Sequence, residues 1–453
     1  MIRKPTEDEN NLMTSSHPGI MRLGIAALVA FLAIPGECLA QLPISEPPVV
    51  SPGSSPREGA SGRVETGLDT TAVVDLFVSL EDRSHLLSLL ALAFFCGALM
   101  RYGRFFRSPG GLLALGILTI ILTGRANLPG YLISCGAVYG YVCILAWGIG
   151  VRRRGDPVRW RWSLLALSIL VAAFLCRSRW PEGLRWQVGG IRWNPVYLDM
   201  WLVLRLAILL WEYGAGRIER PSSLAFATWC MLPFTLFGPL LRFSEYERQL
   251  PWKKLDVPSL DRRWWAEVAF WLMILGLGVV TELASLWLNS VPRWGRAAIT
   301  FSTGPWSVYL ISAGSSWLIL KAGILGGLTL PVSMNRPFRS TNISDFWARW
   351  NISATNVFRD TLFYNRWGLR VANPYLNTMI LFLTVGLWHS MNGYWVLWGL
   401  MHGIGFCTFI AWKRLRGPGA APMPRPVGWA LTYLFVCSCW VAPSKVLLFL
   451  NRL

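Results

Sequence analysis

The sequence is short of charged residues for its length. Only 15% of its 453 residues are Asp, Glu, Lys or Arg, whereas a soluble domain usually has about 25%. Long stretches therefore hold too few charged side chains to face water, which argues against one large soluble domain. The hydrophobic share of 53% also excludes a disordered chain, which needs low hydrophobicity. The composition therefore favours a polytopic membrane protein.

Three sequence patterns are absent, and each absence argues against a class of site or fold. The nine Cys form no Cys-x-x-Cys pair, so we interpret them as small apolar packing residues and expect no metal site and no disulfide framework. No Gly-x-Ser-x-Gly nucleophile motif occurs. No internal repeat is visible, which disfavours a transporter built from inverted halves.

The charge that is present is mostly basic and lies between the apolar runs. The chain has 43 Lys and Arg against 24 Asp and Glu, which gives a net charge of +19. Basic clusters such as 101–107 and 152–161 are typical of loops that face the cytoplasmic leaflet of a membrane. We therefore expect a lipid bilayer as a partner and no nucleic acid, which would need a basic stripe on a polar surface.

Three regions are expected along the chain. Residues 1–40 are predicted to be a signal-peptide-like or other N-terminal segment, because the apolar core over 23–35 is short for a bilayer crossing of about 20 residues. Residues 41–80 are rich in Pro, Ser and Gly, which predicts an extracytoplasmic linker. Residues 81–453 are predicted to form one multi-pass membrane domain.

Apolar runs alternate with basic loops from residue 86 onward, which predicts an all-α polytopic membrane protein. We expect about 10–12 transmembrane or re-entrant helices. Several runs are interrupted, for example at Gly238-Pro239, and broken helices need cover from protein or water at membrane depth. If the run 223–241 is re-entrant instead of a full crossing, the basic stretch 242–263 lies on the cytoplasmic side. The predicted spans are 86–100, 111–124, 131–149, 163–176, 196–214, 223–241, 266–288, 305–330, 376–388, 393–411 and 428–449.

The region 333–370 differs from an ordinary span because it mixes charged and aromatic residues. This spacing predicts an amphipathic helix at the membrane interface, and Ser344 is the expected cap at its start. The residues that recur at three- and four-residue spacing are Asp345, Phe346, Arg349, Trp350 and Ser353.

A second unusual region, 385–403, contains two of the four His of the chain. His389 and His402 both lie in a Trp- and Gly-rich apolar run. An ionisable side chain at membrane depth indicates a functional site by default, and imidazole changes charge near neutral pH, which suits proton transfer. The alternative is a packed histidine in a helix bundle, and composition leaves both interpretations open.

Together the two regions resemble the membrane-bound O-acyltransferase family. They are most similar to its bacterial cell-surface branch, which includes the alginate O-acetyltransferase membrane subunit and the teichoic acid D-alanyl transferase. A segment from Pro233 to Leu250 also resembles the family, so the resemblance covers about residues 230–411. Several motifs in the family's order make it specific. These motifs are Asn-Arg-Pro-Phe at 335–338, Ile-Ser-Asp-Phe-Trp-Ala-Arg-Trp-Asn-Ile-Ser at 343–353, Arg-Asp at 359–360, Gly-Leu-Trp-His at 386–389 and Gly-Leu-Met-His-Gly at 399–403.

The resemblance implies two catalytic residues. His389 matches the family's essential His, and a neutral imidazole can take a proton from an attacking hydroxyl and pass it to a leaving thiolate. Asn351 stands where this branch usually has His and other branches have Asn or Asp. It cannot accept a proton, so its implied role is a hydrogen bond to the thioester oxygen or the hydroxyl. We expect direct transfer without a covalent acyl-enzyme.

Four further residues are candidate substrate-binding residues. His402 lines the substrate route or packs inside a helix bundle. Arg349 and Arg359 contact a phosphate of the donor or lie at the membrane interface with their charges in water. Asp360 is expected to pair with Arg359 or with a neighbouring Arg.

The predicted function is therefore that of an integral protein of the bacterial cytoplasmic (inner) membrane. It transfers an acyl group, acetyl by resemblance, from a thioester donor to hydroxyls of a cell-surface polysaccharide through a central tunnel. The donor, acyl-coenzyme A or an acyl carrier, is a co-substrate, and no tightly bound cofactor is expected. The resemblance also implies an extracytoplasmic esterase-like partner protein. There are two alternatives. One is a membrane acyltransferase that acts on a lipid or a protein, and the other is an export or transport component that catalyses no reaction.

Overall fold

The structure of the protein is a computed structural model. The chain divides into two units, Met1–Ala91 and Leu92–Leu453. The predicted N-terminal segment 1–40 lies outside the described residues, and so does the linker 41–80 up to its last residue. The described residues are 80–124, 128–148, 157–176, 186–188, 191–193, 198, 200–235, 239–249, 259–286, 293–363, 373–390, 392–417, 419, 421 and 423–450.

The described chain is built almost entirely from α-helices, which confirms the predicted fold class. Ten of the described helices have 15 residues or more. They are α3 (Leu80–Tyr102), α4 (Pro109–Gly124), α5 (Leu128–Gly148), α6 (Pro157–Cys176), α7 (Met200–Gly214), α10 (Arg262–Leu286), α11 (Arg293–Leu325), α14 (Pro374–His389), α15 (Gly393–Arg416) and α16 (Arg425–Leu450).

Shorter elements connect these helices. Strands β1 (Trp186–Val188) and β2 (Ile191–Trp193) form an antiparallel hairpin with Gln187 opposite Arg192. Four short helices are α8 (Ser223–Cys230), α9 (Phe243–Glu247), α12 (Ile343–Trp347) and α13 (Ile352–Phe358). The 3₁₀ turns are η3 (Arg104–Arg107), η7 (Pro233–Thr235) and η10 (Pro337–Arg339), and η11 (Arg359–Phe363) is a π-helical turn.

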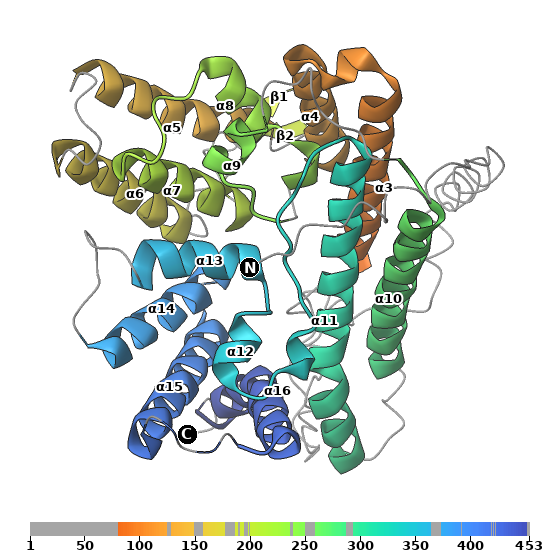
Figure 1. Ribbon diagram of the computed structural model, residues 1–453, viewed down its shortest axis with the longest axis vertical. Coiled ribbons are helices and arrows are strands. Elements are labelled where there is room, and N and C mark those ends of the chain that lie inside the picture. Colours follow the sequence, from red (N-terminus) through yellow and green to blue (C-terminus); the bar gives the residue numbers. More distant parts are fainter. Residues whose placement is uncertain are drawn as a thin grey trace, which may run out of the picture. The chain divides into compact units, whose positions relative to one another are not determined.

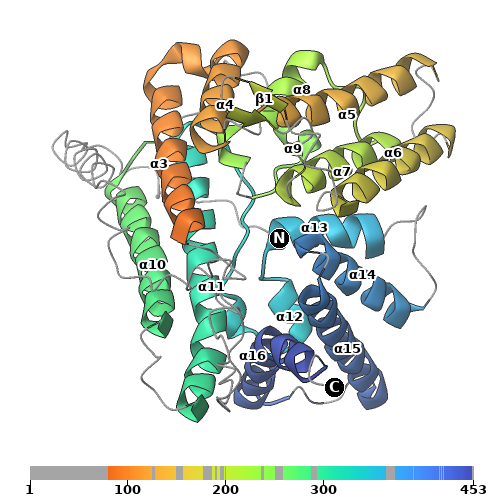
Figure 2. The ribbon, with the colours of Figure 1, turned by 180° about the vertical axis from the view of Figure 1, so that it is seen from behind.

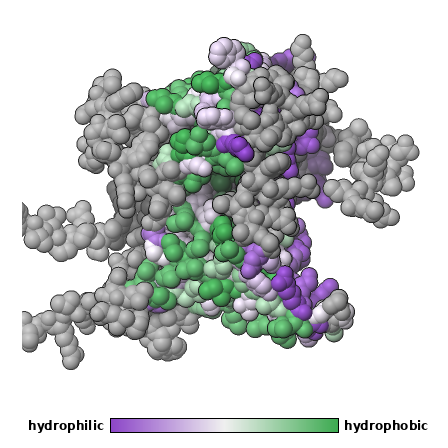
Figure 3. Space-filling model, turned by 90° about the vertical axis from the view of Figure 1, so that its left-hand side faces the viewer, coloured by the Kyte–Doolittle hydropathy of each residue, from purple (hydrophilic) through white to green (hydrophobic). Residues whose placement is uncertain are grey.

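Five described helices are long and apolar enough to cross a membrane. Their apolar residues are not all buried against other helices: Trp147 is 89% exposed and Ile144 is 66% exposed. Figure 3 shows such apolar side chains gathered over one face of the molecule. This exposure matches a surface that contacts lipid. The five spans are Leu128–Gly148, Arg262–Ala284, Thr303–Leu325, Gly393–Arg416 and Arg425–Leu447.

The described part of the run 223–241 is not one continuous helix. Helix α8 has 8 residues and is therefore only about 12 Å long, whereas the hydrocarbon core is about 30 Å thick. The chain then turns through η7 and enters α9, another short helix. None of the five candidate spans includes the described part of this run, and its re-entrant course stays a prediction.

The long helices of the second unit pack in pairs. Helices α10 and α11 run side by side, and α14 packs along α15 (Figures 1 and 2). Helix α16 contacts both α15 and α11, and α12 contacts α15. Helix α13 contacts α7. The two sequence regions that carry the family motifs, 333–360 and 385–403, therefore meet within this helix group.

The single amphipathic helix predicted for 333–370 is wrong in detail. The chain forms α12 and α13 with a break between them, because Asn351 adopts a left-handed backbone conformation with φ 42°. The expected cap, Ser344, lies inside α12. Asn342 is the cap instead, and its side chain accepts a hydrogen bond from the backbone N–H of Asp345 at 2.8 Å.

Candidate active site

The Asn-Arg-Pro-Phe segment and the Arg-Trp-Asn segment are held side by side by backbone hydrogen bonds. The N–H of Asn335 donates to the carbonyl of Arg349 at 2.9 Å. The N–H of Ile352 donates to the carbonyl of Ser333 at 2.7 Å. These two bonds flank Asn351, so its position is set by a neighbouring strand of chain as well as by its own helix.

Ser353 connects this loop to the upstream Gly-Pro-Leu-Leu-Arg segment. Its hydroxyl accepts a hydrogen bond from the backbone N–H of Leu240 at 3.2 Å and lies 3.2 Å from the hydroxyl of Ser333. Ser353 is buried, so these bonds satisfy polar groups that water does not reach. The upstream segment and the region 333–353, which are far apart in the sequence, therefore share one hydrogen-bonded structure.

Asn351 adopts a left-handed backbone conformation, which Asn tolerates better than most residues. Its φ of 42° and ψ of 51° lie in the left-handed region, where Asn, Asp and His are enriched among residues other than Gly. These are also the residue types that the family resemblance associates with this position. Within the described part of the chain the Asn351 side-chain amide makes no hydrogen bond.

His389 is the last residue of α14, and its ring lies among tryptophans. The imidazole is parallel to the indole of Trp395, with a centroid distance of 4.1 Å and an angle of 10° between planes. Trp388 and Trp398 lie 4.7 and 5.7 Å away. Trp395 is itself fixed at the start of α15, because its N–H donates to the side chain of Asn392 at 3.0 Å. The imidazole therefore has one well-defined plane.

Two glycines allow α14 and α15 to come this close. A Cβ at Gly386 would lie 2.3 Å from the carbonyl oxygen of Trp395, and a Cβ at Gly399 would lie 2.6 Å from that of Phe382. No real side chain could occupy either position without moving a helix. Small residues of this kind are what closely packed membrane helices use. The glycines of the two His motifs therefore place His389 against Trp395.

Trp440 of α16 brings the two predicted catalytic residues into one aromatic cluster. Its ring lies 6.4 Å from that of Trp350 and 6.3 Å from that of Trp395. Trp350 directly precedes Asn351 in the sequence, and Trp395 stacks on His389. The residue before Asn351 and the ring stacked on His389 therefore both contact Trp440.

His402 is buried in the core of the helix group. It is 1% exposed, and its ring is surrounded by those of Trp347, Phe382, Trp398 and Phe435 at 4.4–5.8 Å. Neither imidazole nitrogen has a hydrogen-bond partner among the described residues, and the same is true of the indole N–H groups of Trp347 and Trp398. These contacts match the packed-histidine alternative, and a substrate contact of His402 stays a prediction.

The two candidate arginines have different surroundings. Arg349 pairs with Asp345 one turn earlier, at 2.8 Å, and also approaches the carbonyl of Asn335 at 3.5 Å. Its guanidinium group therefore stabilises the loop that holds Asn351. The side chain of Arg359 is 47% exposed, and Asp360 is its ion-pair partner, at 3.4 Å.

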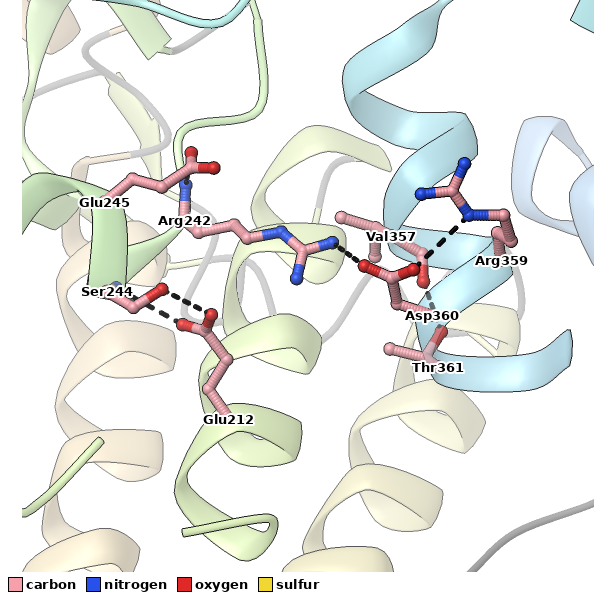
Figure 4. Close-up of polar contacts among 8 residues, drawn as sticks. All are labelled: Glu212, Arg242, Ser244, Glu245, Val357, Arg359, Asp360 and Thr361. Atoms are coloured by element: carbon pink, nitrogen blue, oxygen red, sulfur yellow. Dashed lines mark hydrogen bonds and ion pairs between the residues drawn. The ribbon is translucent and has the colours of Figure 1, made fainter. Parts of the chain in front are cut away.

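Asp360 joins α13 to the upstream motif (Figure 4). Its carboxylate accepts a hydrogen bond from Arg242 at 2.6 Å, a shorter contact than that with Arg359. The predicted ion pair of Asp360 is confirmed, and its nearer partner is 118 residues away in the sequence. Beside this pair, the carboxylate of Glu212 accepts a hydrogen bond from the hydroxyl of Ser244 at 2.6 Å.

A cavity of about 570 Å³ opens at these charged residues. It is lined by the end of α7 and the turn after it, by the segment around α9, and by α13 with η11. Four arginines face it: Arg217, Arg242, Arg248 and Arg359. Ser353, two residues after the predicted catalytic asparagine, lines it as well. Among the described residues no group of His, Cys, Asp and Glu could hold a metal ion.

Sequence reasoning did not identify three residues of this region. Arg242 lies in the upstream segment that resembles the family, so its motif was the available signal. Arg217 and Trp440 lie outside the range 230–411, and no local pattern sets them apart from other interfacial arginines and tryptophans. Only the tertiary structure brings them to the site.

Comparison with known proteins extends the family match beyond the motifs. The family model described as "MBOAT, membrane-bound O-acyltransferase family" matches residues 191–450, from β2 to the end of α16. This range contains every candidate site residue. It is also more than half of the chain.

Several curated proteins are similar to parts of this chain. A peptidoglycan O-acetyltransferase of Helicobacter pylori is 28% identical over 226 residues, which is 46% of this chain and 41% of the relative. A protein of Pseudomonas aeruginosa named probable alginate O-acetylase AlgI is 33% identical over 258 residues, 54% of this chain and 48% of the relative. A teichoic acid D-alanyltransferase of Streptococcus thermophilus is 32% identical over 113 residues, 23% of this chain and 27% of the relative.

The chain spans about half the length, or less, of these relatives. The match covers the helices and loops that hold Asn351, His389 and His402. The multi-pass helical structure, the motifs in their order and the family model agree. The chain belongs to the membrane-bound O-acyltransferase family.

Proposed function

We propose that this chain transfers an acyl group, by default acetyl, from a thioester donor to hydroxyl groups of a cell-surface polysaccharide. The observation that supports the proposal is the aromatic cluster around Trp440, which contacts Trp350, next to Asn351, and Trp395, which stacks on His389. The names of the relatives support an acetyl group and a polysaccharide acceptor. The location is the bacterial cytoplasmic membrane.

The reaction needs a base for the acceptor and a polar group for the thioester carbonyl. The Nε2 or Nδ1 atom of neutral His389 takes the hydroxyl proton as the alcohol oxygen attacks the carbonyl carbon. The carbon–sulfur bond then breaks, and the same proton passes from the imidazole to the leaving thiolate. The amide of Asn351 donates a hydrogen bond to the carbonyl oxygen as negative charge develops there. The ester forms directly, without an acyl-enzyme.

The stacked tryptophan suits this proton transfer. The imidazole becomes positively charged in the transition state, and the face of an indole attracts a cation. Stacking also keeps the imidazole plane fixed, so that the proton can move between two bound substrates without reorientation. The proposal places the donor on the cytoplasmic side and the acceptor outside, with a tunnel between them and an esterase-like partner for the acceptor.

Labelled acetate incorporation tests the proposal in cells. Label in alkali-labile esters of the surface polysaccharide is compared between cells with the intact gene, without it, with His389→Ala and with His85→Ala. We expect equal loss without the gene and with His389→Ala, at unchanged protein level, and full incorporation with His85→Ala, whose residue belongs to the first unit. Unchanged label in every strain would contradict the proposal and direct the search to lipid or protein acceptors or to transport.

A further inference from the structure

We infer that Arg205 of α7 is a positioning residue for acyl transfer, because it fixes the chain segment that supports the loop of Asn351. The inference rests on the proposed function, since it assigns Arg205 a part in that reaction. The segment through which Arg205 acts is 230–244, which contains the end of α8, η7 and the start of α9. We call it the connecting segment.

Arg205 is an unusual residue for its surroundings. Helix α7 is otherwise apolar, and Arg205 and Glu212 are its only charged residues. Arg205 is 2% exposed. A guanidinium group stays ionised in proteins, and a buried charge is costly unless it is hydrogen-bonded. Packing alone would favour an apolar side chain here, so the charge indicates a specific role.

The guanidinium group of Arg205 binds the connecting segment where α8 ends. Its Nη2 donates to the carbonyl of Cys230 at 3.1 Å, and its Nη1 donates to the hydroxyl of Thr235 at 2.5 Å. Cys230 is the last residue of α8, so its carbonyl has no partner within the helix. A cation at a helix C-terminus is also favoured by the helix dipole. Arg205 therefore stabilises the end of α8 and holds the turn that follows in one position.

Tyr131 of α5 adds a third contact. Its hydroxyl accepts a hydrogen bond from Nη2 of Arg205 and donates to the carbonyl of Cys230 at 2.5 Å. The guanidinium carbon also lies 5.8 Å from the ring of Trp229, within the range of a cation–π contact. The planar fork of an arginine can reach these acceptors together, whereas the ammonium group of a lysine is a compact point charge. These contacts join α5, α7 and the connecting segment.

Glu212 holds the other end of the connecting segment. It lies about two turns after Arg205 on α7, which places the two residues on the same face of the helix. Its carboxylate accepts hydrogen bonds from the hydroxyl of Ser244 at 2.6 Å and from the N–H of Ser244 at 3.3 Å (Figure 4). The connecting segment is therefore fixed to α7 near both of its ends.

Between these two ends the connecting segment is bonded to the Asn351 region. The N–H of Leu240 donates to the hydroxyl of Ser353 at 3.2 Å, and Ser353 follows Asn351 by two residues. Arg242 donates to Asp360, just after α13, at 2.6 Å. A displacement of the connecting segment therefore displaces the start of α13, where Asn351 lies.

The same helix also contacts the end of α14. The indole N–H of Trp388 donates to the carbonyl of Met200, the first residue of α7, at 2.6 Å. The ring of Trp201 lies 5.7 Å from that of Trp388, and His389 is the next residue. Helix α7 is therefore a common support for both predicted catalytic residues. Such support affects rate, because a misplacement of about 1 Å can cost about 10²-fold.

Acetyl transfer by the purified full-length protein in lipid vesicles tests the inference, with kcat expressed per folded molecule. Arg205→Lys keeps the charge but not the fork, and Thr235→Val removes one acceptor of Arg205. We expect kcat to fall roughly tenfold for Arg205→Lys and roughly threefold for Thr235→Val, with KM changed by less than about twofold. In the Asn351→Gly background neither substitution should lower kcat further, because the residue that they position is already lost.

Lys321→Met is the matched control. Lys321 is another buried cation, at 7% exposure, and it pairs with Glu267 of α10. Loss of the charge should lower thermal stability, because Glu267 loses its partner. It should leave kcat per folded molecule unchanged.

Hydrogen exchange provides a second measurement that does not depend on the reaction. The peptide 349–356 should exchange faster in Arg205→Lys and Thr235→Val than in the wild-type protein, and as in the wild type in Lys321→Met. Unchanged exchange of this peptide, unchanged kcat, or equal losses of kcat with and without Asn351→Gly would each overturn the inference. If the wild-type protein transfers no acetyl groups, the proposed function fails, and the exchange rates alone decide whether Arg205 fixes the loop.

Discussion

The imidazole of His389 lies parallel to the indole of Trp395, with ring centroids 4.1 Å apart and planes inclined by 10°. The two residues belong to different helices, α14 and α15, and the glycine at 386 makes their approach possible. Such stacking holds the imidazole in one orientation and favours its protonated form. In the proposed reaction this form exists while the proton moves from the hydroxyl to the thiolate.

Replacing Trp395 should lower the rate of transfer more than the affinity for substrates. Trp395→Leu removes the aromatic face, and a loss of about 0.5–2 kcal/mol of cation–π attraction corresponds to a fall in kcat of roughly 2- to 30-fold. Trp395→Phe keeps a ring and should recover part of the rate. Steady-state kinetics of both variants measure whether kcat falls more than KM changes.

A second stacked tryptophan provides the control for the previous prediction. Trp271 of α10 lies parallel to Trp317 of α11, with centroids 5.0 Å apart and planes inclined by 2°, whereas the described tryptophan rings around His389 belong to α14 and α15. Trp271→Leu should lower thermal stability without changing kcat per folded molecule. If Trp395→Leu behaved like Trp271→Leu, the stack on His389 would have only a packing role.

Backbone and side-chain roles of Asn351 can be separated. Asn351→Gly retains the left-handed backbone at no steric cost, so the melting temperature should be nearly unchanged while kcat falls by about 10²–10³ through loss of the amide donor. Asn351→Ala should lose the same activity and also about 1–2 kcal/mol of stability, because φ is positive there. Wild-type kcat in the glycine variant would exclude a role of the amide in catalysis.

The ion pair between Arg242 and Asp360 should couple the upstream motif to α13. Both side chains are partly buried, at 12% and 24% exposure, so loss of one partner leaves the other without its charge-assisted hydrogen bond. Arg242→Gln and Asp360→Asn should each cost about 1–3 kcal/mol. The double variant should cost less than the sum of the two. Thermal unfolding of the four proteins measures this coupling, and strict additivity would show that the pair contributes no interaction energy.

A methyl group at residue 386 should separate α14 from α15. Gly386→Ala places Cβ 2.3 Å from a backbone oxygen, which forces a helix shift that costs about 1–3 kcal/mol and displaces His389. Gly276→Ala is the control, since its Cβ would meet nothing within 4 Å, and it should be neutral or slightly stabilising. We expect lower thermal stability and lower activity for the first variant only.

Sequence reasoning predicted the helical membrane fold, and the roles of its candidate catalytic residues stay predictions. Apolar runs between basic loops are enough to predict spans, because the bilayer imposes both length and hydrophobicity. The motifs around His389 and Asn351 were recognisable because their residue types and order are local features of the sequence. The ion pair of Asp360 was also predictable, since a carboxylate among arginines rarely stays unpaired.

The remaining features depend on contacts between distant segments. The break before α13 was missed because helical spacing continues through Asn351, and only its positive φ ends the pattern. The hydrogen bond between Tyr394 and Trp440 joins residues 46 positions apart, and the pair of Arg242 and Asp360 joins residues 118 positions apart. Three- and four-residue spacing shows which residues are neighbours on one helix, and it does not predict contacts between segments that are distant in the sequence.

Acetyl transfer by the purified protein in lipid vesicles tests the central claim most directly. A labelled acetyl thioester and an oligosaccharide of the surface polymer are supplied to wild-type protein and to His389→Ala, and ester-linked label on the sugar is measured. The account predicts transfer by the wild-type protein and a loss of about 10²–10⁴-fold for His389→Ala, with unchanged thermal stability. Transfer at the wild-type rate by His389→Ala would contradict it.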